Sequence, residues 1–362
     1  MKTIELKTGT LKVEPNKILD NLVSFGSRIN KKRGFFFVSK VTGKHMAVKP
    51  SKALETYKEL ASLIPTSDEP TLFIGFAEAA TALGQGVFEQ YNSKNSFYIH
   101  SSRFQTSNKV LLSFQEEHSH APSHIFYEPI DKDLRLMLKD ITRIILVDDE
   151  ISTGNTANNL IKELKKIFLD IKDYYVVTIL DWTSKKYDSF KCLSLYKGGF
   201  SFERNDKKVD IKIKSEPHHS EIKNLDEVIP YNFGKYGVKK SDIDISKYID
   251  LDKLKDKKVL VLGTAEFMYI PYLLSQYIED NGIDCYFQAT TRSPINIDGE
   301  ITSKIEFVDN YFENIDNFLY NVIDNDYDNI IICYETTSLP KEFDLKSQLE
   351  KKFVVQEIFF KI

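Results

Sequence analysis

A short stretch in the first half of the chain combines residue types that could bind a sugar phosphate. It reads IILVDDEISTGNT, from Ile144 to Thr156, and places Asp148 and Asp149 between an apolar run and a turn rich in hydroxyl groups. Ionised carboxylates only accept hydrogen bonds, so an adjacent pair suits the two donors of a vicinal diol. Backbone amides and hydroxyl groups suit a phosphate, and a glycine lets the backbone approach it closely. The candidate phosphate ligands are Ser152, Thr153, Gly154, Asn155 and Thr156. The stretch therefore predicts a site for a ribose 5-phosphate.

The surrounding sequence predicts an α/β fold that would position this site. Short apolar runs alternate with amphipathic segments, which is typical of parallel strands joined by crossover helices. In open α/β sheets, ligands bind at the carboxyl ends of the strands, where the two aspartates are expected. The expected elements are a helix at 51–64, strands at 71–75, 96–100, 143–148 and 174–181, helices at 78–90 and 156–169, and an irregular stretch between 100 and 143.

The second half of the chain predicts a second, smaller α/β domain. Residues 192–214 favour a hairpin around Gly198 and Gly199, and a polar, lysine-rich connector follows before a strand at 258–263. A chain of 362 residues is long enough for two cores. The predicted parts are residues 1–235, a linker at 236–256 and residues 257–362.

Composition and charge exclude several classes of function. The formal net charge is −4 and the charges are mixed along the chain, which argues against nucleic acid and a membrane surface as partners. Three distant cysteines argue against a disulfide framework or a zinc site. The first residues lack a signal-type apolar core, and no apolar run approaches the length of a bilayer span. We therefore expect a soluble cytoplasmic protein, and a homodimer is compatible with the sequence.

The first stretch resembles the phosphoribosyl diphosphate (PRPP) motif of type I phosphoribosyltransferases, which has four apolar residues, two acidic residues and then Thr-Gly-x-Thr. A response-regulator receiver also carries an apolar strand ending in DDE, but it does not explain Thr153, Gly154 and Thr156. The resemblance implies a parallel sheet with a hood, with Asp148 and Asp149 on the ribose hydroxyls. It also implies Mg²⁺ that is carried mainly by PRPP oxygens and water.

Other segments resemble further parts of the family in the expected order. A diphosphate-binding loop would follow the strand at 71–75, and Arg103 would meet the leaving diphosphate. The loop residues are Gly75, Phe76, Ala77, Glu78 and Ala79. Close helix packing is the alternative for the loop, and an ordinary surface arginine is the alternative for Arg103.

A histidine-rich stretch, FQEEHSHAPSH, contains two further catalytic candidates, Glu117 and His118. A mobile catalytic loop occupies this interval in the family, so the resemblance implies a lid from Phe114 to Ser123. The acidic residues depart from the family, because they repel diphosphate unless Mg²⁺ or a basic group lies between. A zinc site is the alternative, although the histidine spacing fits no regular zinc pattern.

The amino-terminal segment SRINKKRGFFFVSKVTGKH carries basic residues around an apolar strand, and the resemblance implies a hood over the acceptor base. The hood and acceptor candidates are Arg33, Lys40, Lys44, His45 and Trp182. A solvated basic turn is the alternative for the basic residues, and core packing is the alternative for Trp182.

The second half resembles the domain named for its Thr-Arg-Ser-Pro (TRSP) signature, which lies carboxyl-terminal to one branch of phosphoribosyltransferases. The resemblance rests on FQATTRSPI at 287–295 and on GTAEFMYIPYLL before it. Members of this branch are associated with bacterial stress-response and tellurite-resistance gene neighbourhoods. Their acceptor is not established, so the resemblance implies a reaction class without a substrate.

An internal repeat is also expected. Gly75, Ala77 and Glu78 recur after the strand at 258–263 as Gly263, Ala265 and Glu266, and Arg292 follows at nearly the spacing of Arg103. In the repeat, Tyr334 and Glu335 replace the two aspartates, and no Thr-Gly-x-Thr turn follows. We expect this half to lack a phosphoribosyl site, with Arg292 either contacting an anion or the acceptor, or bracing a contact between domains.

The resemblance implies transfer of the 5-phosphoribosyl group from PRPP to a nitrogen of a base-like acceptor, with release of diphosphate. The alternative is a PRPP-binding or nucleotide-binding regulatory protein without transferase activity. A PRPP synthetase would need an ATP site, which we could not locate in the sequence.

Overall fold

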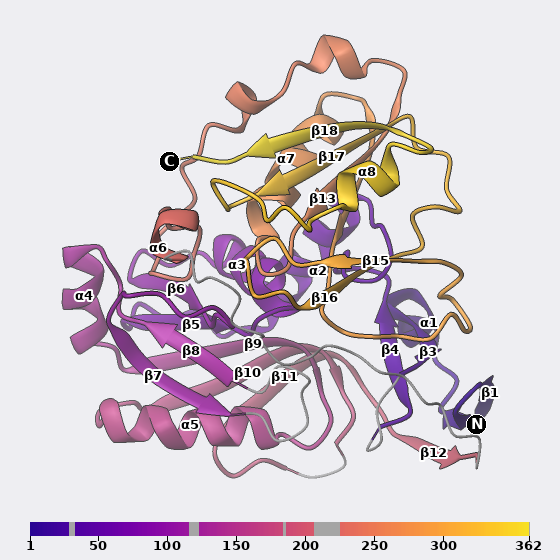
Figure 1. Ribbon diagram of the computed structural model, residues 1–362. Helices are drawn as coiled ribbons and strands as arrows, with labels where there is room; N and C mark the ends of the chain where they lie inside the picture. Colours follow the sequence, from indigo (N-terminus) through magenta and orange to yellow (C-terminus); the bar gives the residue numbers. More distant parts are fainter. Residues whose placement is uncertain (29–32, 116–122, 184–185, 206–224, 362) are drawn as a thin grey trace. The chain divides into compact units, whose positions relative to one another are not determined.

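The computed structural model describes residues 1–28, 33–115, 123–183, 186–205 and 225–361 (Figure 1). The chain forms two compact units, each built from separated segments. The first-sheet unit contains Leu54–Gly198 and Tyr231–Ile243. The second-sheet unit contains Met1–Ala53, Gly199–Pro230 and Asp244–Lys361. The amino-terminal 53 residues thus group with the carboxyl-terminal part of the chain, a grouping that no local sequence pattern indicates.

The first-sheet unit is built on a five-stranded parallel sheet in the order β11-β10-β9-β5-β6. Its strands are β5 (Thr71–Gly75), β6 (Ser96–His100), β9 (Arg143–Ile151), β10 (Asp173–Asp181) and β11 (Lys191–Lys197). Its helices are α2 (Pro50–Leu63), which begins at the boundary between the units, α3 (Ala80–Gln90), α4 (Lys132–Lys139) and α5 (Asn155–Ile167). The hairpin β7 (Val110–Gln115) and β8 (Ser123–Tyr127) completes the unit. The α/β class expected from the sequence is confirmed.

Burial explains why these segments form a parallel sheet. Strands β5 and β6 are buried along their whole length, as expected for strands covered on both faces. Helix α3 packs against β5, β6 and β9. Helix α5 buries one stripe that contains Leu160, Ile161 and Leu164, and its last turn holds two lysines, which interact favourably with the helix dipole.

Two sequence predictions for this part of the chain are wrong. The strands on either side of Gly198 and Gly199 do not form a hairpin, because β11 pairs with β10 whereas β12 (Phe200–Arg204) pairs with β2 in the second-sheet unit. Phe200 and Phe202 alternate along β12 and therefore lie on one face of the strand. Both of their rings pack against the ring of Phe35. The described part of the stretch between 100 and 143 is also not irregular, since it contains the β7–β8 hairpin and α4.

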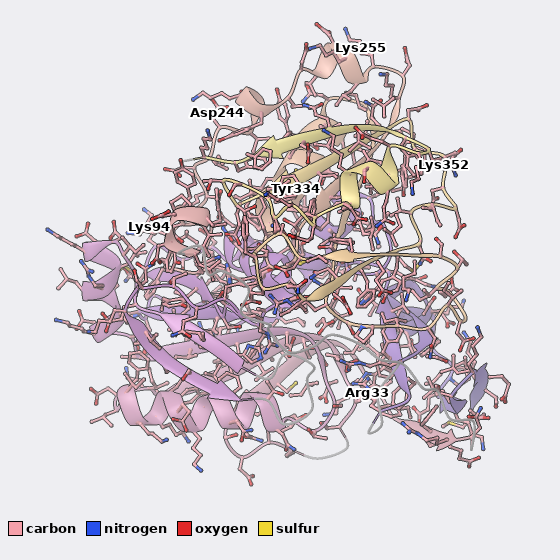
Figure 2. The ribbon with its side chains drawn as sticks, in the orientation of Figure 1. Arg33, Lys94, Asp244, Lys255, Tyr334 and Lys352 are labelled. Atoms are coloured by element: carbon pink, nitrogen blue, oxygen red, sulfur yellow. The ribbon has the colours of Figure 1, made fainter. Side chains whose placement is uncertain are left out.

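The second-sheet unit is built on a four-stranded parallel sheet in the order β14-β13-β17-β18. These strands are β13 (Lys258–Gly263), β14 (Asp284–Ala289), β17 (Asn329–Tyr334) and β18 (Val354–Phe359). The antiparallel strands are β1 (Lys2–Leu6) and β2 (Gly9–Val13) with β12, β3 (Val23–Ser27) with β4 (Phe35–Ser39), and β15 (Lys304–Val308) with β16 (Asp316–Tyr320). The helical segments are α1 (Lys17–Leu22), α6 (Leu225–Val228), α7 (Tyr269–Asp280), α8 (Leu345–Leu349) and the 3₁₀ turns η1 (Ile245–Tyr248) and η2 (Leu251–Leu254). Tyr334 lies in the interior of this unit, whereas Lys255 and Lys352 are exposed (Figure 2).

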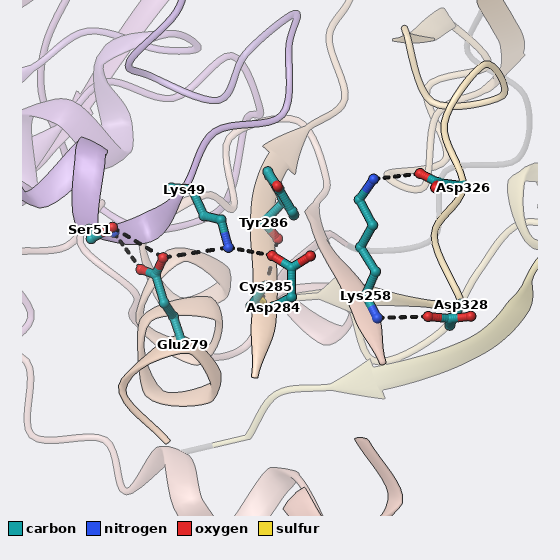
Figure 3. A network of polar contacts seen from close by, with 9 residues as sticks. All are labelled: Lys49, Ser51, Lys258, Glu279, Asp284, Cys285, Tyr286, Asp326 and Asp328. Atoms are coloured by element: carbon teal, nitrogen blue, oxygen red, sulfur yellow. Dashed lines mark hydrogen bonds and ion pairs between the residues drawn. The ribbon is translucent and has the colours of Figure 1, made fainter. Parts of the chain in front are cut away.

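The amino-terminal segment is part of the second-sheet unit through backbone pairing. Val48 forms an antiparallel bridge with Phe287 on β14, and the amide of Ala289 donates to the carbonyl of Gly43 at 2.7 Å. Lys49 also contacts Asp284 on β14 at 2.5 Å (Figure 3). Exposed ion pairs contribute little to stability, so the backbone pairs and the buried Phe287 are the stronger attachment.

The two parallel sheets share their strand order. Reading across each sheet, β6-β5-β9-β10 corresponds to β14-β13-β17-β18, and every neighbouring pair is parallel. Gly75 lies opposite Val147 in the first sheet, and Gly263 lies opposite Cys333 in the second. The strand order expected of an internal repeat is therefore confirmed. In neither unit does a described helix have the length and apolar character needed to cross a membrane.

Candidate functional site

The two aspartates lie at the carboxyl edge of the first sheet, at the point where the strand order reverses. Strand β5 pairs with β6 on one side and with β9 on the other. The position between β5 and β9 is therefore the topological switch point of the sheet. Pairing of β9 with β5 ends at Val147, whereas its pairing with β10 continues to Ile151. Asp148 and Asp149 thus extend past the end of β5.

Both carboxylates are half-buried, and their environment alters their acidity. The amide of Asp149 donates to Asp148 Oδ1 at 3.0 Å. Burial raises the pKa of Asp149 to about 6, and the charge of the adjacent Glu150 adds to the rise. Alternation along β9 directs Asp148 and Glu150 to one face and Asp149 to the other. The edge therefore presents carboxylate acceptors on both faces of β9.

The predicted phosphate cradle is the turn after β9, which leads into helix α5. Gly154 has a φ of +76°, a left-handed conformation that favours glycine. A Cβ at this position would lie 2.5 Å from Tyr187 Cε1, so the turn also needs a residue without a side chain. Helix α5 begins at Asn155, and the Asn155 amide donates to Thr153 Oγ1 at 3.3 Å. The positive end of the α5 dipole is thus adjacent to the hydroxyl-bearing residues Ser152, Thr153 and Thr156.

The loop after β5 is held by two polar contacts from the end of β6. The amide of Ala77 donates to Ser101 Oγ at 2.9 Å, and Arg103 Nη2 donates to the carbonyl of Ala77 at 3.0 Å. A Cβ on Gly75 would lie 2.7 Å from the carbonyl oxygen of Ala80, which explains the glycine. Helix α3 begins at Ala80 rather than at Glu78, so the loop extends from Gly75 through Ala79. The structure thus brings Arg103 to the predicted diphosphate loop.

Comparison with known protein families matches residues 22–195 to a family described as phosphoribosyl transferase. It matches residues 236–350 to the TRSP domain that lies carboxyl-terminal to that family. The chain belongs to the phosphoribosyl transferase family with a carboxyl-terminal TRSP domain. No curated protein matches the chain.

Solved structures of several phosphoribosyltransferases resemble part of this chain. The adenine phosphoribosyltransferase of Thermoanaerobacter pseudethanolicus is 15% identical, with a TM-score of 0.34, and the match covers 49% of this chain and 97% of that one. The xanthine-guanine-hypoxanthine phosphoribosyltransferase of Helicobacter pylori is 16% identical, with a TM-score of 0.27, over 41% and 86% of the two chains. The fold class is assigned from the strand order of the parallel sheet and not from these matches.

Two buried residues that the sequence patterns did not assign to the predicted diphosphate loop, Ser101 and His124, lie behind it. Ser101 Oγ, which holds the Ala77 amide, shares a 2.8 Å hydrogen bond with His124 Nδ1. The His124 ring is stacked on Phe114, with ring centroids 4.8 Å apart. His100 Nδ1 donates to the carbonyl of Ser101 at 2.9 Å, and burial, with a contribution from a nearby lysine, lowers the pKa of His100 to about 3. Their only signal in the sequence is position, directly after β6 and within the histidine-rich stretch.

The histidine-rich stretch is only partly described. Glu117 and His118 lie outside the described residues, so the lid and the catalytic roles of these two residues stay predictions. His124 lies on β8 and is buried against Phe114. Within the described ranges, no group of three His, Cys, Asp or Glu side chains could hold a metal ion.

The basic hood candidates Arg33 and Lys40 lie in the second-sheet unit. The guanidinium of Arg33 stacks over the rings of Phe35 and Phe37, at 4.8 and 5.3 Å from the centroids. Lys40 Nζ donates to the carbonyl of Asp20 at 3.0 Å. Both side chains thus contribute to the packing of the amino-terminal strands.

Lys44 and His45, the other two basic candidates, pack inside the second-sheet unit. Lys44 is buried, and its Nζ donates to the carbonyl of Thr290 at 2.9 Å. The His45 ring lies 5.1 Å from Phe36 and 6.0 Å from Tyr320, measured between centroids. Lys44 thus contacts the segment that carries the TRSP signature, whereas His45 packs against aromatic residues of β4 and β16.

Trp182 lies in the first-sheet unit, directly after β10. Its ring is buried and meets Tyr196 edge-on, with centroids 5.4 Å apart. Its backbone amide donates to the carbonyl of Ile151 at 2.9 Å. Trp182 thus packs beside the end of β9, and its acceptor role stays a prediction.

Proposed function

We propose that this protein transfers the 5-phosphoribosyl group from PRPP to a nitrogen of a base-like acceptor and releases diphosphate. One observation carries the proposal. A carboxylate pair, a glycine turn at a helix start and an arginine-braced loop all lie at the carboxyl edge of one sheet. Together they match the three chemical parts of PRPP, namely the ribose diol, the 5-phosphate and the diphosphate.

The reaction exchanges one bond at the anomeric carbon of the ribose. The bond from this carbon to diphosphate oxygen breaks, and its electron pair leaves with the diphosphate. The lone pair of the acceptor nitrogen forms the new bond, and that nitrogen then loses a proton. The carbon becomes cationic between these events, so nearby negative charge stabilises the transition state.

The residues of the site divide this work by their chemistry. Asp148 and Asp149 accept hydrogen bonds from the ribose hydroxyls and place negative charge near the cationic carbon. The turn from Ser152 to Thr156 binds the 5-phosphate and fixes the ribose in position. The loop at Gly75–Ala79, together with Arg103, binds the departing diphosphate.

Mg²⁺ fits this site through its preference for oxygen ligands. The carboxylates at this edge form no three-ligand metal site among the described residues, so they could supply only part of the oxygen set that Mg²⁺ prefers. Bound mainly through PRPP oxygens and water, the ion would neutralise charge on the diphosphate. The proposal extends to the cytoplasmic, stress-response setting that the resemblance to the TRSP branch implies.

Diphosphate release tests the proposed reaction directly. The full chain is incubated with PRPP, Mg²⁺ and single purine or pyrimidine bases, and diphosphate is measured over time. Release that depends on one base supports transfer and identifies the acceptor. Binding of PRPP without release with any base would favour a PRPP-binding regulatory protein.

A further inference from the structure

Each of the two parallel sheets has two edge strands, and the chain itself covers two of these four edges. On β14, the Phe287 amide donates to the carbonyl of Val48 at 2.8 Å, and the Val48 amide donates back to Phe287 at 2.9 Å. On β6, Tyr98 and Val238 exchange the same pair of bonds, each at 2.9 Å. An edge strand otherwise presents a row of unpaired backbone groups, which natural proteins cover or blunt. Among the described residues, the outer sides of β11 and β18 have no backbone partner of this kind.

Strand β18 is an edge strand of the second sheet (Figure 1), and half of its backbone groups face away from β17. The amide of Phe360, directly after the strand, donates to the carbonyl of Tyr334 on β17 at 2.9 Å. Backbone groups of successive residues point to opposite sides of a strand, so the odd-numbered residues of β18 direct theirs outward. No hydrogen bond within the described chain reaches the outward amides and carbonyls of Val355, Glu357 and Phe359.

The residues of β18 do not protect this open edge. The strand reads VVQEIF and contains neither lysine nor proline, the residues that commonly blunt an edge strand. Strand β11, by contrast, begins and ends with lysine. On one face of β18, Val354 is 62% exposed and Gln356 is also exposed. Strand β18 thus combines unpaired backbone groups with an exposed apolar side chain.

A second copy of β18 fits this edge in one register. A two-fold axis perpendicular to the sheet makes the two strands antiparallel and sets residues of the same face opposite one another. With the axis at Gln356, Val354 lies opposite Ile358 of the partner copy, and Val355 lies opposite Glu357. With the axis one residue later, Glu357 would oppose its own copy, and opposed like charges are destabilising. The axis at Gln356 is therefore the favoured register.

Glu357 brings no unpaired charge to this register. Its Oε1 accepts a hydrogen bond from the Tyr334 hydroxyl at 3.1 Å, and its Oε2 accepts one from Lys346 Nζ at 2.8 Å. Val355 and Phe359, on the same face, pack against the core of their own unit. The face that carries Glu357 is thus satisfied within one copy, and the opposite face supplies the new apolar contact through Val354.

We propose that the outer side of β18 is a dimerisation edge, on which a second copy of this chain pairs antiparallel around Gln356. Val355 of each copy exchanges both backbone hydrogen bonds with Glu357 of the other, and the second sheets of the two copies become one continuous sheet. A single strand pair is a small interface, so the dimer is weak and dissociates in the micromolar range. The pairing does not require transferase activity.

Sedimentation velocity of the full chain across the micromolar range tests the proposal, and we expect a reversible monomer–dimer equilibrium. Val355→Pro removes an outward amide and leaves the bonds to β17 in place, because proline is tolerated where an edge amide faces solvent. It should raise the dissociation constant about tenfold or more, since symmetry removes the bond from both copies. If this variant does not fold by thermal melting, Gln356→Lys replaces it, with the same expected loss from opposed like charges.

Leu193→Pro is the matched control on the other uncovered edge. The Gly198 amide, directly after β11, donates to the carbonyl of Asp181 on β10 at 3.0 Å, so the Leu193 amide faces away from β10. This variant also places a proline on an edge strand without breaking a bond to the neighbouring strand. It should leave the dissociation constant unchanged.

A cysteine at the two-fold axis tests the register. Opposed residues at position 356 form a non-hydrogen-bonded pair with Cα atoms about 4.5 Å apart, which a disulfide can span. Gln356→Cys should therefore form a covalent dimer under mild oxidation, seen on a non-reducing gel. Val354→Cys should not, because its two copies lie about 13 Å apart along the strands. The unmodified chain, with its own Cys192, Cys285 and Cys333, gives the background.

Each of three results would overturn the inference. The chain could sediment as a monomer throughout the micromolar range, which is also the result expected if the edge receives a segment of another protein. The prolines at positions 355 and 193 could weaken the dimer equally. The cysteine at position 354 could crosslink as readily as the one at position 356.

Discussion

The two parallel sheets of this chain share strand order but differ in the residues that come directly after the third strand. In the first sheet, half-buried Asp148 and Asp149 lead into a glycine turn that starts α5. In the second, the buried Glu335 is bound by Tyr311, and the next turn is bound to α6. The same topology can thus support different chemistry, because function depends on the residues at the sheet edge rather than on the sheet.

The largest expected effect is the loss of PRPP turnover when the two carboxylates of the first sheet edge are replaced. Replacing Asp148 and Asp149 together with asparagine removes charge-assisted hydrogen bonds, each worth about 1.5 to 3 kcal/mol. We expect PRPP turnover to fall at least about a hundredfold, with the melting temperature retained. Steady-state diphosphate release measures the loss. The Glu357→Gln variant of β18 should turn over PRPP at the unmodified rate, and a double variant as active as the unmodified chain would remove these aspartates from the mechanism.

A smaller effect is expected from the glycine that distinguishes the two turns. Gly154→Ala forces a side chain into a left-handed conformation, which costs about 1 to 2 kcal/mol, and pushes against Tyr187. We expect PRPP affinity to fall about tenfold because the phosphate turn shifts.

Gly282→Ala provides the matched control for this turn. Gly282 also has a positive φ, of +83°, but its Cβ would meet nothing within 4 Å. This variant should lose some stability in thermal melts, because its alanine also takes a left-handed conformation, and it should keep its PRPP affinity. Equal PRPP affinities in the two alanine variants would show that the Gly154 turn does not bind phosphate.

The hydrogen bond from the Ala77 amide to Ser101 Oγ offers a still smaller effect. Ser101→Ala leaves the buried amide of Ala77 without its acceptor, at a cost of about 1 to 3 kcal/mol. We expect KM for PRPP to rise several-fold while kcat changes less, because Ser101 positions the loop rather than reacting. Ser275→Ala, which removes a buried hydroxyl on α7 bonded to the Tyr272 carbonyl, should leave KM unchanged. A loss confined to stability in the Ser101 variant would argue against a positioning role.

The smallest expected effect concerns the pH dependence at the first edge. In the proposed site, Asp149 accepts hydrogen bonds from the ribose only when it is ionised, so kcat/KM for PRPP should fall as the pH drops through about 6. The negative charge of Glu150 helps to raise the pKa of Asp149, so Glu150→Gln should move this acid limb to lower pH, by less than about one unit. PRPP phosphates also titrate near pH 6, but they do so equally with both proteins. Superimposable profiles would mean that Asp149 does not control the limb.

The sequence predicted β5, β6 and β13 well because each of these strands is buried along nearly its whole length. The strands at 71–75, 96–100 and 258–263 lie where the patterns placed them. The turn and helix start near Gly154 could also be predicted, because the residue types and spacing that indicate them are local. The structure adds the left-handed Gly154 and the start of α5 beside it.

The remaining features depend on contacts between distant segments, which no local pattern encodes. The bridge between Val48 and Phe287 draws the amino terminus into the second-sheet unit. The hydrogen bond between Ser101 and His124 exists because the end of β6 pairs with β8 at Ser102 and Ile125. Neither pairing could be read from periodicity or spacing.

The most direct test of the central claim is a crystal structure of the full chain with PRPP and Mg²⁺. We predict density for PRPP at the first sheet, with its 5-phosphate on the turn from Ser152 to Thr156 and its ribose hydroxyls on Asp148 and Asp149. PRPP bound beside Glu335 at the second sheet, or bound at neither edge under saturating conditions, would contradict the account.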